Sequence, residues 1–105
     1  MLPLIEYFNK RLPVEFVNTT GKLIEDVKIY KNNIVEREEK ELAPFEELEY
    51  TFNKFEASNI NLRYTIDGVE VNDSNVIGVN TDRPLTINFV PITYNIGQIK
   101  RIYVD

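Results

Sequence analysis

Residues 59–72 read NINLRYTIDGVEVN, and this stretch decides the fold. Apolar and polar residues alternate on both sides of Asp67-Gly68, which is the pattern of two β-strands joined by a tight turn. A two-residue Asp-Gly loop suits a type I′ turn, because both central residues need a positive φ that Gly adopts freely and Asp tolerates. The stretch therefore predicts a β-hairpin.

The same residues predict the register of the hairpin. Counting outward from the turn sets Ile66 opposite Val69, and directly opposed residues share a face. One face then holds only apolar residues and the other only polar ones, whereas a slip of one residue would mix them. We expect the apolar face to lie in the core, and its members are Leu62, Tyr64, Ile66, Val69 and Val71.

Alternation elsewhere predicts more short strands. The expected strands are residues 13–17, 23–31, 34–42, 47–55, 76–79 and 85–89, with a last hairpin of 92–96 and 99–104 around Gly97-Gln98. Each sheet would have one apolar face to bury, and two sheets packed face to face meet that need. The prediction is an all-β fold, a single antiparallel β-sandwich of seven to nine strands with an immunoglobulin-like arrangement. A small β-barrel is the alternative.

The segment 34–42, IVEREEKEL, has a composition that favours a helix. A helix here would have almost no apolar stripe to bury, since little beyond Ile34, Val35 and Leu42 is available. We therefore expect a charged edge strand, a common protection against edge-to-edge aggregation.

The length of 105 residues suits one domain. We expect residues 1–12 to form an N-terminal arm and residues 13–105 the β-domain. No basic region follows Met1 and Glu6 interrupts the first apolar run, so we expect no signal peptide. No apolar run approaches the roughly 20 residues of a membrane span. A cytoplasmic or virion location is the default expectation.

Cysteine and histidine are both absent. Disulfides, thiol nucleophiles, imidazole bases and the usual zinc ligands are thereby excluded. We expect no enzyme, no cofactor and no metal. The two Asn-x-Ser/Thr sequons, at Asn18 and Asn72, are interpreted as turns.

An acidic strip between residues 36 and 49 carries the whole net charge of −5, since acids and bases balance in the rest of the chain. One hypothesis is a docking face for a basic partner protein. Another is a mimic of nucleic acid that inhibits a nucleic-acid-processing enzyme, and a third is a solvated edge without a partner. Its members are Glu36, Glu38, Glu39, Glu41, Glu46, Glu47 and Glu49.

Two weaker ligand hypotheses concern other residues. Oxygen ligands for Ca²⁺ gather between residues 67 and 75, although their spacing does not fit an EF-hand. They are Asp67, Glu70, Asn72, Asp73 and Asn75. Exposed tyrosines could form a carbohydrate-binding or protein-binding platform, namely Tyr30, Tyr94 and Tyr103.

These observations favour a non-enzymatic module for protein-protein interaction or structure, such as a viral, phage or cell-surface component. We expect a protein partner or self-association into a homo-oligomer, through edge strands or the chain ends. The negative charge argues against direct binding of nucleic acid.

Overall fold

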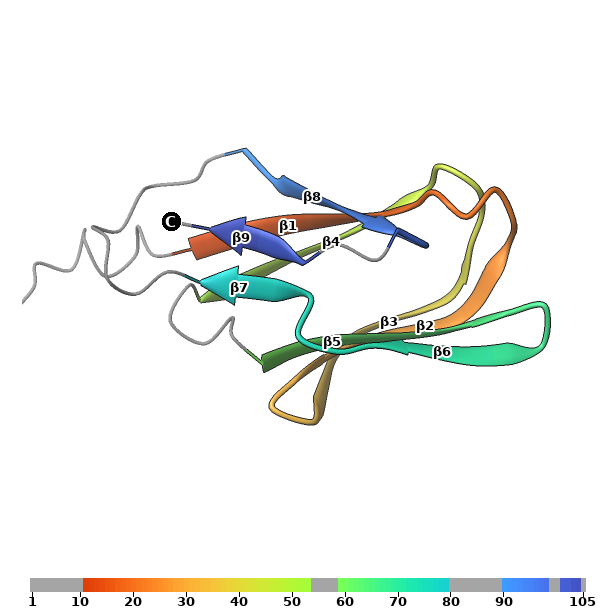
Figure 1. The fold of residues 1–105 in the computed structure, drawn as a ribbon, viewed down its shortest axis with the longest axis horizontal. Coiled ribbons are helices and arrows are strands. Elements are labelled where there is room, and N and C mark those ends of the chain that lie inside the picture. Colours follow the sequence, from red (N-terminus) through yellow and green to blue (C-terminus); the bar gives the residue numbers. More distant parts are fainter. Residues whose placement is uncertain (1–10, 54–58, 80–89, 99–100, 105) are drawn as a thin grey trace, which may run out of the picture.

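The computed structural model describes residues 11–53, 59–79, 90–98 and 101–104 (Figure 1). These residues form nine strands and no α-helix, so the predicted all-β class is confirmed. No helix suited to crossing a membrane occurs in these ranges. The strands are β1 (Arg11–Asn18), β2 (Ile24–Lys31), β3 (Ile34–Leu42), β4 (Glu47–Asn53), β5 (Ile60–Ile66), β6 (Val69–Asp73), β7 (Ile77–Val79), β8 (Ile92–Ile96) and β9 (Ile102–Val104).

Two sheets lie one above the other in the view of Figure 1. One has the order β4-β1-β8 and the other the order β3-β2-β5-β6, while β7 and β9 form a small separate pair. The small pair is joined to β5 through Val76, whose N–H donates to the Ile60 carbonyl and whose own carbonyl accepts from Ile102 N–H. The immunoglobulin-like sandwich stays a prediction.

Strand pairing is not purely antiparallel, which corrects the sequence prediction. β8 pairs in parallel with β1, beginning with Val14 opposite Ile92, and β9 pairs in parallel with β7. The predicted hairpin around Gly97-Gln98 is therefore wrong, because its two arms belong to different sheets. Local alternation fixes which face of a strand is buried, but it does not specify the partner strand.

The β5-β6 hairpin has the predicted turn and register. Asp67 and Gly68 have φ of 51° and 76°, and Ile66 lies opposite Val69. Its apolar face is only partly in the core, however: Leu62 and Tyr64 are buried, whereas Val69 is 62% exposed. The hairpin tip extends past the ends of β1 and β8, so nothing from the facing sheet covers it (Figure 1).

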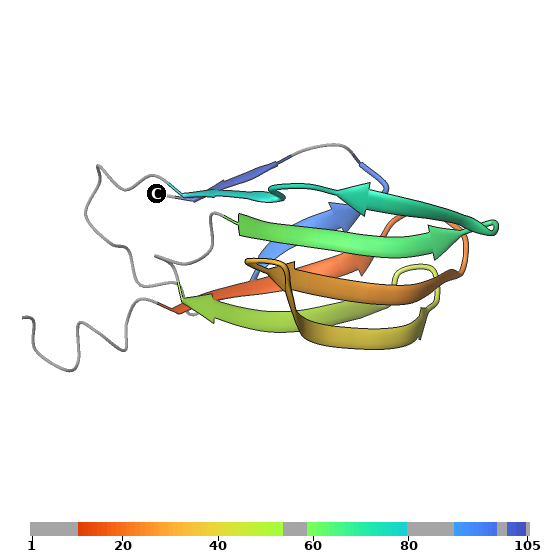
Figure 2. The same ribbon diagram turned by 90° about the horizontal axis from the view of Figure 1, so that it is seen from below.

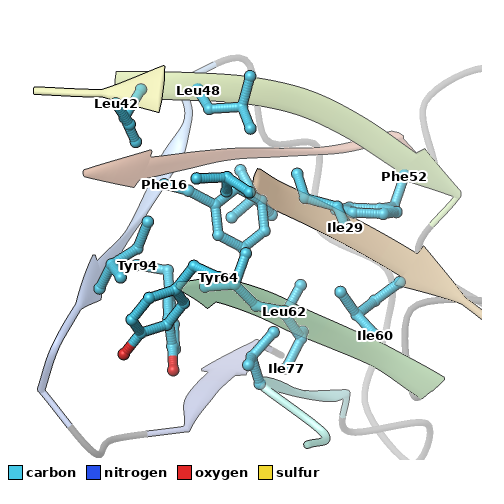
Figure 3. Close-up of a cluster of buried hydrophobic side chains, with 14 of the residues drawn as sticks. Phe16, Ile29, Leu42, Leu48, Phe52, Ile60, Leu62, Tyr64, Ile77 and Tyr94 are labelled. Carbon is cyan, nitrogen blue, oxygen red and sulfur yellow. The ribbon is translucent and has the colours of Figure 1, made fainter. Parts of the chain in front are cut away.

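The core lies between the two sheets and is aromatic at its centre (Figure 3). Phe16 of β1 contacts Phe52 of β4 at 6.5 Å between ring centroids, with the rings nearly perpendicular. On its other side Phe16 meets Tyr94 of β8 at 5.7 Å. Edge-to-face and tilted ring pairs of this kind each stabilise by about 0.5–1.5 kcal/mol beyond their burial.

Several element boundaries differ from the predictions. β1 starts at Arg11 with Leu12 fully buried, so Leu12 belongs to the core rather than to the predicted arm, and residues 1–10 lie outside the described part. β6 continues to Asp73, past the turn predicted at Asn72. β7 begins at Ile77. The predicted strand 85–89 lies outside the described residues.

Candidate functional site

The acidic strip folds into one side of the molecule. β3 carries Glu36, Glu38, Glu39 and Glu41, the following turn carries Glu46, and β4 carries Glu47 and Glu49. β3 and β4 are edge strands of different sheets, as predicted for β3, and they run side by side along the same flank (Figure 2). We call this surface the acidic edge.

Glu36 joins the two sheets rather than facing solvent freely. It is the extra residue of a β-bulge, because Arg37 pairs with Ile29 while Val35 pairs with Tyr30. Its Oε2 accepts a hydrogen bond of 3.0 Å from the Tyr50 hydroxyl of β4, and its Oε1 lies 3.4 Å from Lys31 Nζ. Burial and the Glu36 carboxylate both raise the pKa of Tyr50, so this hydroxyl keeps its proton.

Glu46 is also engaged, within its own turn. Its Oε1 accepts a hydrogen bond of 2.8 Å from Ala43 N–H, and its backbone N–H donates to the Ala43 carbonyl at 3.0 Å. The carboxylate therefore acts on the shape of the turn between β3 and β4.

The other carboxylates are available to a partner. Glu38, Glu41, Glu47 and Glu49 are exposed, and no ion pair neutralises them within the part of the chain that the structure describes. Glu39 is half-buried.

Two cross-strand pairs at this flank join like charges. Glu41 lies directly opposite Glu25 of β2, and Glu49 lies directly opposite Glu15 of β1. Like charges in directly opposed positions destabilise a sheet. These two pairs are therefore unfavourable for the fold, whereas Glu38 lies opposite Lys28.

Asn18, at the end of β1, organises the loops beside the acidic edge. It is fully buried, and its Nδ2 donates to the carbonyls of Lys22 at 2.7 Å and Leu42 at 2.8 Å. Its Oδ1 accepts from Thr20 N–H at 3.0 Å and from the Thr20 hydroxyl at 2.6 Å. Every donor and acceptor of the amide is therefore used, as burial requires.

This role was missed in the sequence, where NTTG was interpreted as a turn. The signal was the alternation of β1, because Leu12, Val14 and Phe16 point inward and residue 18 continues that face. The same burial leaves no open amide for a glycan at this sequon. Asn72, in the other sequon, is exposed on β6.

The opposite flank has its own link between sheets. The Tyr94 hydroxyl of β8 donates to Asp73 Oδ2 of β6 at 3.1 Å, and the Tyr64 hydroxyl lies on the same side (Figure 3). Burial raises the pKa of both tyrosines, and the Asp73 charge raises them further. Tyr94, predicted as an exposed aromatic, is thus a core residue.

The five oxygen-bearing residues of the calcium hypothesis are spread along β6 instead of converging. Asp67 pairs with Lys22 at the hairpin tip, and Asp73 at the far end of β6 accepts from Tyr94. A strand advances about 3.3 Å per residue, so the two carboxylates are far apart. Across the described ranges, no three acidic side chains are grouped to hold a metal ion.

The remaining predicted aromatics lie on outer surfaces. Tyr30 is half-buried under the Arg63 guanidinium, whose carbon is 4.8 Å from the ring centroid. They border a shallow depression of about 320 Å³ on the four-stranded sheet, which also includes Asp26, Lys28 and Glu70. Tyr103 is exposed on β9 and packs over Gly78. The tyrosines therefore do not form one platform.

Comparison with known proteins does not assign the chain to a family. No protein-family model, curated protein or solved structure matches this chain significantly.

Proposed function

We propose that the chain is a non-enzymatic protein-binding module whose acidic edge docks on a basic surface of a partner protein. The observation that supports this proposal is the set of four exposed carboxylates without ion pairs, Glu38, Glu41, Glu47 and Glu49, on two neighbouring edge strands. Complementary charge on a partner would steer its approach and fix its orientation. It would also relieve the like-charge pairs at Glu25 and Glu15.

The backbone of β3 offers a second means of binding. Among the described strands β3 has β2 as its one hydrogen-bonded neighbour, so its other edge presents backbone groups for strand addition. The bulge at Glu36 interrupts the regular edge, which leaves residues 37–42 as the regular part. A partner strand with basic residues would meet Glu38 and Glu41 there.

Single charge reversals test the proposal. The tagged chain is used to capture partners from a lysate of its source cells, and the recovered protein is then produced and its binding measured by calorimetry. Glu38→Lys, Glu47→Lys and Glu49→Lys should each weaken binding by about two- to tenfold, with a smaller effect at high salt. Glu70→Lys, the same charge change on β6 at the opposite edge of the sheet, is the matched control.

The results also distinguish the kind of partner. If duplex DNA competes with the chain for the recovered protein, the acidic edge occupies a nucleic-acid-binding surface of the partner and acts as a mimic. If DNA does not compete, an ordinary basic docking surface is indicated. Three reversals that bind as tightly as the parent would refute docking through the acidic edge.

A further inference from the structure

In the turn between β3 and β4, a phenylalanine, Phe45, occupies a position with a positive φ. Glu46 N–H donates to the Ala43 carbonyl, which closes a four-residue turn with Pro44 and Phe45 in the centre. Pro44 has a negative φ because of its ring, whereas Phe45 has φ of 65°. A negative φ followed by a positive φ defines a type II turn, in which the second central position favours glycine.

Phe45 gains no burial in exchange for this conformation. Its side chain is 77% exposed, among the most exposed large apolar side chains of the described residues. A left-handed conformation is unfavourable for a bulky residue, and glycine would adopt it without strain. The fold therefore does not account for a phenylalanine here, and backbone outliers of this kind concentrate at functional sites.

Hydrogen bonds to Asn18 at the end of β1 fix the backbone of this turn. Phe45 N–H donates to the Asn18 carbonyl at 2.8 Å, and Asn18 N–H donates to the Glu46 carbonyl at 2.9 Å. The buried Asn18 amide fixes Leu42, just before the turn, by a further hydrogen bond. An aromatic ring held on a fixed backbone loses little freedom when it binds, which favours affinity.

The surroundings of Phe45 are acidic. The turn joins the end of β3 to the start of β4, and Glu41, Glu46 and Glu47, all exposed, lie close to Phe45 in the chain. A second copy of this chain would bring the same negative charges, and an anionic lipid surface would be repelled as well. A cationic surface with an apolar pocket is complementary to both features.

We propose that Phe45 is the anchor of the interface, a ring that inserts into an apolar pocket of the partner protein rimmed by lysine or arginine. Rigid aromatic residues at the centre of an interface carry a large share of binding energy, while surrounding charges exclude water and set orientation. This inference rests on the proposed function and identifies the part of the acidic edge where binding is strongest.

The first test uses a chemical stand-in for the pocket. An amino-substituted β-cyclodextrin has an apolar cavity that admits a phenyl ring and a rim of ammonium groups, and its binding can be followed by NMR. The wild-type chain should bind it with the largest shifts at Phe45, and Phe45→Gly should reduce affinity at least tenfold. Tyr103→Ala is the matched control, because Tyr103 is 80% exposed but lies beside Arg101 at Gly78.

Two results with this probe would overturn the inference. One is equal affinity of the wild-type and Phe45→Gly chains. The other is equal affinity of the wild-type chain for neutral β-cyclodextrin and the aminated form, since the acidic flank would then contribute nothing.

The second test separates binding from folding and uses the recovered partner. Phe45→Gly should unfold at the same or a higher urea concentration than the wild type, because glycine suits this φ, yet lose partner binding at least tenfold. A markedly lower urea midpoint would make Phe45 a structural residue and overturn the inference. If charge reversals abolish partner binding while Phe45→Gly retains it, the proposed function stands and the anchor role fails.

Discussion

Replacing Asn18 by aspartate keeps the shape of the side chain and removes its hydrogen-bond donor. The carbonyls of Lys22 and Leu42, now 2.7 and 2.8 Å from the amide nitrogen, would face a carboxylate oxygen instead. The buried Leu42 carbonyl, left without this partner, costs about 1–3 kcal/mol, whereas the Lys22 carbonyl belongs to an exposed residue and also has the Thr20 hydroxyl at 3.1 Å. Burying a charge adds to this loss. The total loss is a substantial part of the about 5–15 kcal/mol by which an ordinary domain is stable.

The loss in free energy of unfolding caused by Asn18→Asp should depend on pH. Burial and the two facing carbonyls would raise the pKa of the new carboxyl above the ordinary value of about 3.9, against the opposing effect of the Thr20 N–H and hydroxyl, which donate to Oδ1. Near pH 3 the group is protonated in both the folded and the unfolded chain, and its hydroxyl can donate to one carbonyl. As the pH rises past about 4, the unfolded chain releases its proton first, so the free energy of unfolding falls until the folded chain has also ionised.

Asn18→Ala is the reference that isolates this effect, because it removes the same donor without adding a charge. The measurement is urea unfolding of both variants between about pH 3 and 7, followed by circular dichroism and tyrosine fluorescence, since the chain has no tryptophan. Asn18→Asp should be less stable than Asn18→Ala at pH 7, and the difference between their free energies of unfolding should become smaller as the pH is lowered. A gap that is constant with pH, or an aspartate variant as stable as the wild type, would refute the role assigned to the amide.

Three further changes test other parts of the structure. The folded chain should lose stability above about pH 10, because burial raises the pKa of Tyr94 and the unfolded chain therefore ionises first. Tyr94→Phe should make this alkaline loss smaller. Alkaline unfolding curves that coincide with those of the parent would contradict this. Gly68→Ala should cost about 1 kcal/mol in thermal unfolding, and Gly97→Ala more, since both have positive φ but only at Gly97 would a Cβ lie 2.7 Å from a neighbouring side chain; equal losses would argue against that clash. Val69→Lys should change the free energy of unfolding by no more than about 0.5 kcal/mol, whereas Leu62→Ala should cost about 2–5 kcal/mol, and comparable losses would place Val69 in the core after all.

Features set by neighbouring residues were predictable from the sequence. Asp67-Gly68 specifies its own turn, because few residue pairs tolerate two positive φ values, and the flanking alternation then sets the register. β3 was predictable as an edge strand despite its helix-favouring composition, because its segment has too few apolar residues to bury a helix face. The acidic edge followed from charge counting, since β3 and β4 are joined by a short turn.

Features set by distant parts of the chain were not predictable. Val69 has the polarity of a core residue, and its exposure depends on where the opposite sheet ends. The alternation of apolar and polar residues does not specify which strand pairs with which, so the pairing of β8 with β1 could not be predicted from it. The role of Phe45 is a similar case: Pro44 indicates a turn, but the positive φ at the next residue follows from the bonds that Asn18 makes to the turn.

The parallel pairing of β1 with β8 also bears on how the chain folds. Val14 and Ile92 come from nearly opposite ends of the sequence, and Thr19 bonds to the Ile96 carbonyl through both its N–H and its hydroxyl. Such non-local contacts raise the contact order, which slows folding because long loops must close first. During synthesis, Phe16 lacks its Tyr94 contact until β8 has left the ribosome. A nascent chain would therefore hold a half-covered aromatic core until β8 is available, and this interval is when chaperone binding or aggregation would compete with folding.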